Sequence, residues 1–263
     1  MALWMLNHLS TLSLALIVVG GIVALSLLGS VLLRRRYPSL ARGEHNEMVG
    51  VVLGVFGAIY GIILAFVVVT LWTQLETTQS VVSAEATDLA LIVRDARVFP
   101  QEAQTRVDQA VSDYVRAVVE ESWPRMRQGQ GDFDATESQM RAMFDALQAY
   151  EPQTAKEQAF YGEMVSRLND VSSQRRARIS TASTQLPVLL QALAYGGALV
   201  LIPLTFLYGM KRMRMQLLFV AAVSGLIGFT LLLVIVLDRP FAGDLSVSPA
   251  AYTQGALERF WYG

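Results

Sequence analysis

The sequence predicts an all-α integral membrane protein with four transmembrane helices in a two-plus-two arrangement. Two long apolar segments, at about residues 12–33 and 48–72, precede a charged insert at 73–185, and two more follow at about 186–208 and 215–237. None of the four contains a charged residue. Each is long enough to cross a hydrocarbon core about 30 Å thick as a helix. A chain of 263 residues holds too little other protein to cover four such helices in a soluble core.

Composition supports a membrane protein whose first partner is the lipid bilayer. Charged residues make up 16% and apolar residues 53% of the chain, whereas soluble proteins carry about 25% charged residues. The net charge of the whole chain is −1, but the insert is acidic, with 12 basic and 17 acidic residues. The chain has no strongly basic segment, so its sequence does not indicate a nucleic-acid partner. Because cysteine is absent, disulfides and thiolate metal sites are excluded.

Basic residues close to the ends of the apolar segments predict the orientation. They lie in the two short loops, at Arg34, Arg35, Arg36, Arg42, Lys211, Arg212 and Arg214. The positive-inside rule places these loops in the cytoplasm, and the insert and both termini outside the cell inner membrane. Four arginines at the end of the insert, at positions 167, 175, 176 and 178, argue the other way. Residues 1–11 contain no Lys or Arg, so we expect the first apolar segment to be a span and not a signal peptide.

The insert shows apolar residues at helical spacing, which predicts an antiparallel four-helix bundle. The first helix continues the second span and ends at Pro100, and the second covers 107–118 and is closed by Trp123-Pro124 and the Gly129–Gly131 turn. Asp134 and Glu137 have capping-box spacing at the start of the third. The fourth begins at Pro152 and enters the third span through a kink at Pro187. The predicted parts are a first transmembrane pair (1–72), a helical domain (73–185), a second pair (186–237) and a tail with a short amphipathic helix (238–263).

Helix geometry predicts one contact between the two stalks that join the bundle to the membrane. Glu85 lies 13 residues after Trp72, and Arg175 lies 12 residues before Pro187, so both sit roughly 20 Å from the membrane. The stalk ion-pair candidates are Glu85 and Asp88 on one side and Arg175, Arg176 and Arg178 on the other. Alternatively, the arginines form a solvated face or contact lipid headgroups.

The second span carries a stripe of glycines at spacings of four, three and four, at Gly50, Gly54, Gly57 and Gly61. Such a stripe lets a second helix approach closely in a bilayer. Close packing is one interpretation. The other is a pore-facing or hinge surface in an oligomer, with an apolar constriction supplied by Phe56, Ile59, Tyr60 and Ile63.

The sequence contains no pattern for catalysis or for ion-coupled transport. The spans lack an ionisable residue, which proton pumps, stators and coupled transporters usually need within the membrane. The two histidines, His8 and His45, lie in separate regions, and no triad, P-loop or dinucleotide motif is present. We therefore expect no enzyme activity, no cofactor and no metal.

Several short motifs together resemble one family. They are Asn46, Gly50, Gly54, Gly57 and Tyr60 with Leu64-Ala65-Phe66, then Glu85-Ala86, Trp123-Pro124, Arg175-Arg176 with Arg178, Leu186-Pro187, and Asp238 with Pro240-Phe241 and Gly243. Their order and spacing resemble the bacterial bestrophin-like family of four-span membrane proteins. The resemblance covers nearly the whole chain from Asn46 onward.

The resemblance implies a distant likeness to bestrophins, pentameric anion channels with an apolar neck in the second span and a calcium-sensing loop. The neck would correspond to Phe56, Ile59, Tyr60 and Ile63, and the loop to Asp238, Pro240, Phe241, Gly243 and Asp244. Ala242 interrupts the loop motif and no acidic run follows, which disfavours a calcium site. Bestrophins also keep their large helical region in the cytoplasm, opposite to the orientation that the basic loops predict here.

Three functional classes remain open. The first is a homo-oligomeric, channel-like assembly with the second span near the pore. The second is a membrane sensor or scaffold whose helical domain binds a protein partner and relays movement through the stalks. The third is a subunit like those of proton-channel stators, although a conducting carboxylate is missing.

Overall fold

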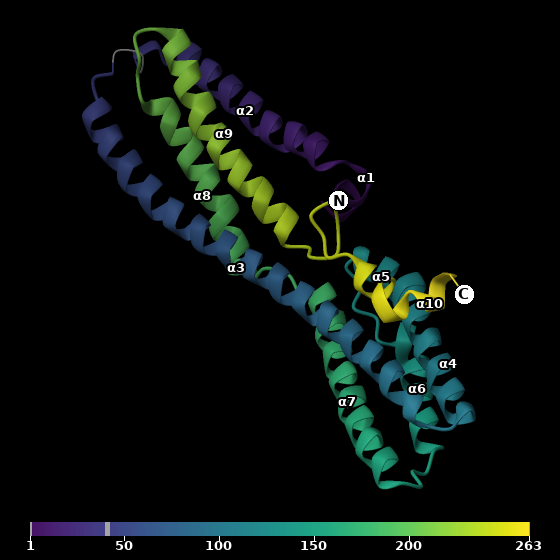
Figure 1. The fold of residues 1–263 in the computed structure, drawn as a ribbon. Coiled ribbons are helices and arrows are strands. Elements are labelled where there is room, and N and C mark those ends of the chain that lie inside the picture. Colours follow the sequence, from purple (N-terminus) through teal and green to yellow (C-terminus); the bar gives the residue numbers. More distant parts are fainter. Residues whose placement is uncertain (1, 40–42, 263) are drawn as a thin grey trace. The chain divides into compact units, whose positions relative to one another are not determined.

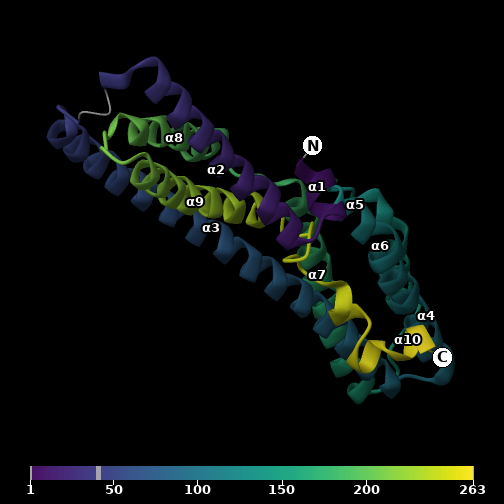
Figure 2. The ribbon, with the colours of Figure 1, turned by 90° about the horizontal axis from the view of Figure 1, so that it is seen from above.

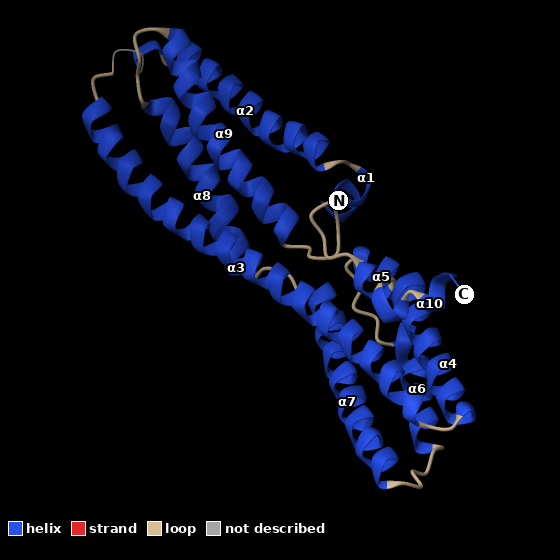
Figure 3. Cartoon of the chain, in the orientation of Figure 1, coloured by secondary structure: helices blue, strands red, loops and turns tan. Residues whose placement is uncertain are grey.

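A computed structural model of the chain describes residues 2–39 and 43–262, and every regular element within them is a helix (Figure 3). The predicted all-α class is confirmed for this part of the chain, while Arg42 lies outside it. The chain divides into two compact units. The membrane unit comprises Met1–Thr73, Gln185–Asp238 and Gly243–Leu245, and the helical unit comprises Gln74–Thr184, Arg239–Ala242 and Ser246–Gly263.

The membrane unit contains the four helices that are long and apolar enough to cross a bilayer. They are α2 (Thr11–Arg36), the first half of α3 (Asn46–Asp95), α8 (Val188–Leu207) and α9 (Met213–Leu237), preceded by the short α1 (Ala2–His8). Helices α2, α8 and α9 run side by side in both ribbon views (Figures 1 and 2). The protein is therefore a multi-pass membrane protein.

The packing of α3 on α8 centres on one aromatic ring. The Tyr60 side chain is buried and its hydroxyl donates a hydrogen bond of 2.6 Å to the carbonyl oxygen of Ala194. A Cβ atom at Gly197 would lie 2.2 Å from the Tyr60 ring, so only glycine leaves room for this side chain. Leu64 and Ala198 belong to the same apolar cluster.

Before the C-terminal tail, the described part of the helical unit contains the second half of α3 and four further α-helices. These are α4 (Gln101–Ala117), α5 (Trp123–Arg127), α6 (Glu137–Gln148) and α7 (Ala155–Ser183), with 3-10 turns at Ala96–Val98 and Asp134–Thr136. Their apolar faces form one core, which includes Leu89, Val111, Met143, Met164 and Leu168.

Three helix boundaries differ from the predicted ones. Trp123-Pro124 does not close the second helix, because the π-helical turn Val118–Ser122 carries the chain into α5 with Pro124 in its first turn, where no N–H is needed. The helical run ends at Arg127, and the predicted turn follows with Gly129 at a φ of +74°. Thr136 at the start of α6 makes no side-chain cap, so the predicted box from Asp134 to Glu137 is not formed. The box forms instead at Thr154 and Glu157, and α7 begins three residues later than predicted, at Ala155.

The two predicted stalks also differ from one another. Helix α3 runs without a break from Asn46 to Asp95. In contrast, α7 ends at Ser183 and α8 begins at Val188, so the chain breaks where a kink is predicted. Pro187 lacks an N–H and disfavours a helical conformation in the residue before it, which explains the break.

The C-terminal tail forms short helical turns, at Pro249–Tyr252, Gly255–Leu257 and Arg259–Tyr262, where the sequence predicts one amphipathic helix. Ser248 caps the first turn, and its hydroxyl accepts from the N–H of Ala250. Tyr252 and Leu257 are buried in the core of the helical unit. The tail is therefore an integral part of that unit.

The Tyr60 contact predicts opposite outcomes for two neighbouring glycines. We expect Gly197→Ala to lower the free energy of unfolding by about 1–3 kcal/mol, because the new methyl group overlaps the Tyr60 ring. Gly196→Ala is the matched control, since its Cβ meets nothing within 4 Å and alanine favours the helix. Thermal unfolding of the detergent-solubilised protein measures both. Equal effects of the two substitutions would contradict the packing of Tyr60 against Gly197.

Candidate functional site

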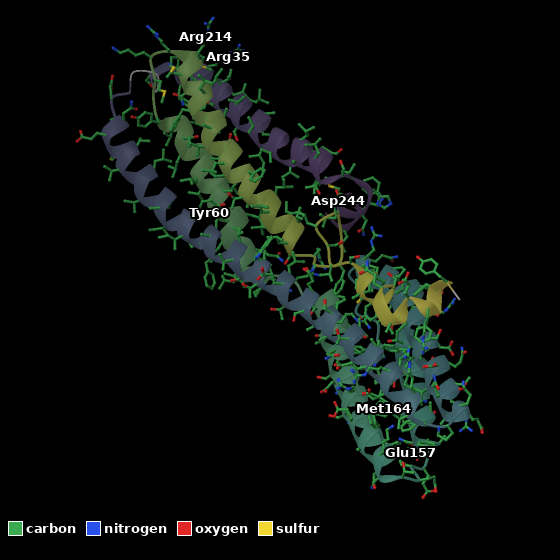
Figure 4. The ribbon with its side chains drawn as sticks, in the orientation of Figure 1. Arg35, Tyr60, Glu157, Met164, Arg214 and Asp244 are labelled. Atoms are coloured by element: carbon green, nitrogen blue, oxygen red, sulfur yellow. The ribbon has the colours of Figure 1, made fainter. Side chains whose placement is uncertain are left out.

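The four predicted neck residues on α3 do not share one environment. Phe56 and Ile59 are 51% and 56% exposed, Ile63 is half-buried, and Tyr60 is buried against α8. Figure 4 shows the position of Tyr60 on the helix. The structure therefore assigns Tyr60 to packing within the chain and leaves Phe56 and Ile59 on its surface.

A cavity of about 330 Å³ lies between α3 and α8, beside Tyr60. All four neck residues line it from α3. Its α8 wall consists of small and aliphatic residues, which are Ala192, Leu193, Gly196, Gly197, Val200 and Leu201. The cavity lining carries no charged group, so it is suited to an apolar occupant or to an apolar constriction.

Most of the glycine stripe of α3 has open space beside it in the described part of the chain. A Cβ atom added at Gly54, Gly57 or Gly61 would meet nothing within 4 Å, and one at Gly50 would only touch the Tyr208 ring at 3.6 Å. At about 100° per residue, the glycines lie on one flank of the buried face that holds Tyr60, and Phe56, Ile59 and Ile63 lie on the other. The glycines and the neck candidates are therefore two separate surfaces.

The helical unit encloses a buried ion pair between α3 and α7. Glu85 and Arg178 are both fully buried. The Nε and Nη2 atoms of Arg178 donate to the two carboxylate oxygens of Glu85 at 2.8 and 3.1 Å. This bidentate geometry satisfies both charges at once and is the strong form of an arginine–carboxylate contact.

Further side chains complete the cluster around Glu85 and Arg178. The Tyr114 hydroxyl donates to Glu85 at 2.6 Å, and Arg178 donates to the Ser122 hydroxyl at 3.3 Å. The Arg178 guanidinium lies 5.9 Å from the centre of the Tyr252 ring. Ser122 is the last residue of the π-helical turn. This irregular turn therefore positions one of the hydrogen-bond acceptors of Arg178.

The charges in the cluster stabilise one another. Burial and the Glu85 carboxylate both raise the pKa of Tyr114 well above its usual value, so Tyr114 stays protonated and donates. Burial lowers the pKa of Arg178, but the Glu85 carboxylate together with Tyr252 and Tyr114 outweighs this and holds the pKa well above its usual value. Arg178 therefore keeps its positive charge beside the Glu85 carboxylate, which suits a structural element and not a proton carrier.

The other predicted ion-pair candidates have other partners. Asp88 lies against Arg167 and accepts from the Gln174 amide at 2.9 Å. Arg175 donates to Thr136 and Glu137, and the exposed Arg176 donates to a backbone carbonyl of its own helix. Of the predicted ion pairs between the stalks, the one between Glu85 and Arg178 is formed.

The residues of the predicted loop are divided between the two units. In the membrane unit, Asp238 accepts from the N–H of Leu186 at 2.6 Å, and Asp244 accepts from the N–H and hydroxyl of Thr11 at 2.8 and 3.0 Å. These bonds to Thr11 lower the pKa of Asp244. Gly243, with φ of +85°, makes the turn that precedes Asp244.

In the helical unit, the carbonyl of Pro240 accepts from the N–H of Val247. The buried Phe241 ring meets Trp123 edge-on, with ring centres 5.4 Å apart. Within the described residues, no group of three His, Asp or Glu side chains is placed to hold a metal ion. The Asp238 and Asp244 carboxylates accept hydrogen bonds from backbone N–H groups.

Comparison with known proteins identifies the family. The model of the bestrophin-like domain matches residues 20–252. The chain belongs to the bestrophin-like family. A comparison with curated proteins finds no match.

Solved structures share the fold of this chain. A crystal structure of a membrane protein variant aligns with a TM-score of 0.68 at 13% identity, covering 92% of this chain and 97% of that one. Two variants of a bacterial bestrophin homologue from Klebsiella pneumoniae align with TM-scores of 0.65 at 14% identity and cover 92% of this chain. They cover 98% and 97% of their own chains. At these identities the likeness establishes the fold.

Sequence reasoning missed three members of the buried cluster in this bestrophin-like protein: Tyr114, Ser122 and Tyr252. Tyr114 lies on an apolar helical stripe, which indicates burial but not a partner for its hydroxyl. Ser122 is placed by a π-helical turn, which has no sequence signature of its own here. Tyr252 lies 74 residues beyond Arg178, and only the folded tail brings it there.

The buried pair predicts a large difference between two arginines of α7. We expect Arg178→Met to destabilise the bestrophin-like protein by about 3–5 kcal/mol, because it leaves the Glu85 carboxylate buried without its counter-charge. Arg176→Met removes the same charge from an exposed position and should stay within about 0.5 kcal/mol of the wild type. Thermal unfolding followed by circular dichroism measures both. A stable Arg178→Met variant would show that the pair is dispensable.

Proposed function

We propose that this bestrophin-like protein assembles as a homo-oligomer that conducts anions, with the α3 helices near the pore. Bestrophins are anion channels whose second-span neck is apolar, and membership of the family supports the same role here. The observation that carries the proposal is the exposed, uncharged face of α3. Phe56 and Ile59 on one flank are about half exposed, and Cβ atoms at Gly54, Gly57 and Gly61 on the other would meet nothing within 4 Å in the described part of the chain.

An apolar neck of this kind fits a channel better than a proton carrier. Hydrophobic constrictions gate channels by expelling water, and they need no ionisable group. Residues 48–72 contain no charged side chain, so a carboxylate that would relay protons, as in a stator subunit, is missing from this helix. The glycines allow the backbone of a second copy to approach α3 closely.

A sensor or scaffold is the second candidate, and one observation favours it. Helix α3 is a single 50-residue helix that belongs to both units. Such a helix transmits movement if the helical unit binds a protein partner. This role requires no conductance, which separates it from the channel.

Removal of the Phe56 ring tests the channel. In planar bilayers containing the purified oligomer, we expect Phe56→Ala to conduct more than the wild type, because the loss of an aromatic ring widens and wets an apolar constriction. The matched control is Phe229→Ala on α9, where the ring is 54% exposed compared with 51% for Phe56. If neither the wild type nor Phe56→Ala conducts although both are oligomeric, the scaffold is favoured.

We further propose that the protein lies in the cell inner membrane with its two short basic loops in the cytoplasm and the helical unit outside. Of the four arginines that argue against this orientation, Arg178 and Arg175 are buried and paired, and Arg167 forms ion pairs with Asp88, Asp95 and Glu163. Paired arginines contribute little to the charge at the membrane surface, so the basic loops dominate the count.

Cysteine labelling tests this orientation, because the natural chain contains no cysteine. We expect a membrane-impermeant maleimide to modify Ser138→Cys, on exposed α6, in intact cells. Ser39→Cys, in the first short loop and also exposed, should react only after the cells are permeabilised. The reverse pattern would place the helical unit in the cytoplasm, as in bestrophins.

A further inference from the structure

An open groove on the membrane unit lies between α2 and α8 at the end that carries the basic loops. Its volume is about 620 Å³, within the range of small-molecule sites. Apolar side chains form most of its walls: Leu32 and Leu33 from α2, and Leu199, Pro203, Leu204 and Phe206 from α8. Gly29 lets the Phe206 ring approach to 3.0 Å from where a Cβ would be, so the groove is shaped by a close helix contact.

Arg36 and Tyr37 bring a charged group and a hydroxyl group to this apolar groove. The Arg36 guanidinium lies 5.1 Å from the centre of the Tyr37 ring, and both side chains are exposed. Among the described residues Arg36 makes no ion pair, so its charge is available to a ligand. Arg34, two residues earlier, is already occupied, because it donates to the Met210 carbonyl and to the Met213 sulfur.

The surroundings of the groove are also positively charged. Arg35 on α2 and Arg214 on α9 lie at the same end of the membrane unit (Figure 4). Lys211 and Arg212 lie in the loop before α9 and are exposed. A ligand at this place therefore meets a positive potential at one end and apolar walls along the helices.

We propose that the groove binds an anionic phospholipid, with an acyl chain between α2 and α8 and the phosphate against Arg36. The chemistry matches in both parts, since basic pockets between transmembrane helices bind anionic headgroups and the apolar walls face lipid. A free phosphate or a soluble anion would leave the apolar groove unfilled. The binding does not depend on conductance or on the orientation of the protein.

Native mass spectrometry of the full chain in detergent tests the headgroup contact. The protein is mixed with equal amounts of phosphatidylglycerol and phosphatidylcholine of the same acyl chains. We expect the wild type to prefer phosphatidylglycerol, and Arg36→Gln to lower the ratio of the two bound lipids about fivefold. Arg35→Gln, which removes an adjacent exposed charge outside the groove, should change the ratio less than about twofold. Equal losses in both variants, or no preference in the wild type, would overturn the proposal.

A second pair of variants tests the groove itself. Leu32 lines it and Leu28, one turn earlier on α2, does not, although both side chains are 55% exposed. We expect Leu32→Trp to fill the groove and reduce bound phosphatidylglycerol severalfold, and Leu28→Trp to leave it unchanged. If Leu32→Trp binds as much lipid as the wild type, the lipid lies elsewhere. If it instead dissociates a lipid-free oligomer, a second copy of the chain occupies the groove, which also excludes the lipid.

Discussion

The helical unit depends on one buried ion pair. Glu85 on α3 and Arg178 on α7 are fully enclosed, and each satisfies the charge of the other. Two charges removed from water destabilise a fold unless their geometry is good, and here two hydrogen bonds with further donors and acceptors provide it. Because Tyr114 and Tyr252 complete the cluster from α4 and the tail, four parts of the chain must be in place together. The pair therefore specifies one arrangement of the helices around it.

The membrane unit follows a different rule, since lipid provides no hydrophobic force between its helices. Its helices are held by close contacts and by hydrogen bonds to backbone groups. The Tyr60 ring packs between α3 and α8 because Gly197 leaves space for it. Asn46 pairs with both backbone groups of Gly209, and Asp244 holds the start of α2. These contacts leave large apolar surfaces uncovered, which is why lipid and further copies of the chain are the expected neighbours.

The predictable parts of the fold and the site are those that local pattern and helix geometry control. Four uncharged segments require a bilayer, and a rise of 1.5 Å per residue puts Glu85 level with the arginines of α7. Position along the helix axis does not determine which arginine points inward. The prediction therefore could not tell that Asp88 and Arg175 have other partners. Likewise, a capping-box spacing occurs at Asp134 and at Thr154, and tertiary context decided that only the second one forms.

The sequence by itself determined the class of the protein, its four spans and the family to which the chain belongs, because long apolar runs and ordered motifs are local properties. Tertiary structure decided which face of each helix is buried. It turned Tyr60 inward, left Phe56 and the glycines on separate outer flanks, and folded the tail into the core of the helical unit. The physical reason is that burial depends on rotation about the helix axis, and in an apolar span nearly every face is compatible with lipid, so only packing against specific neighbours selects one.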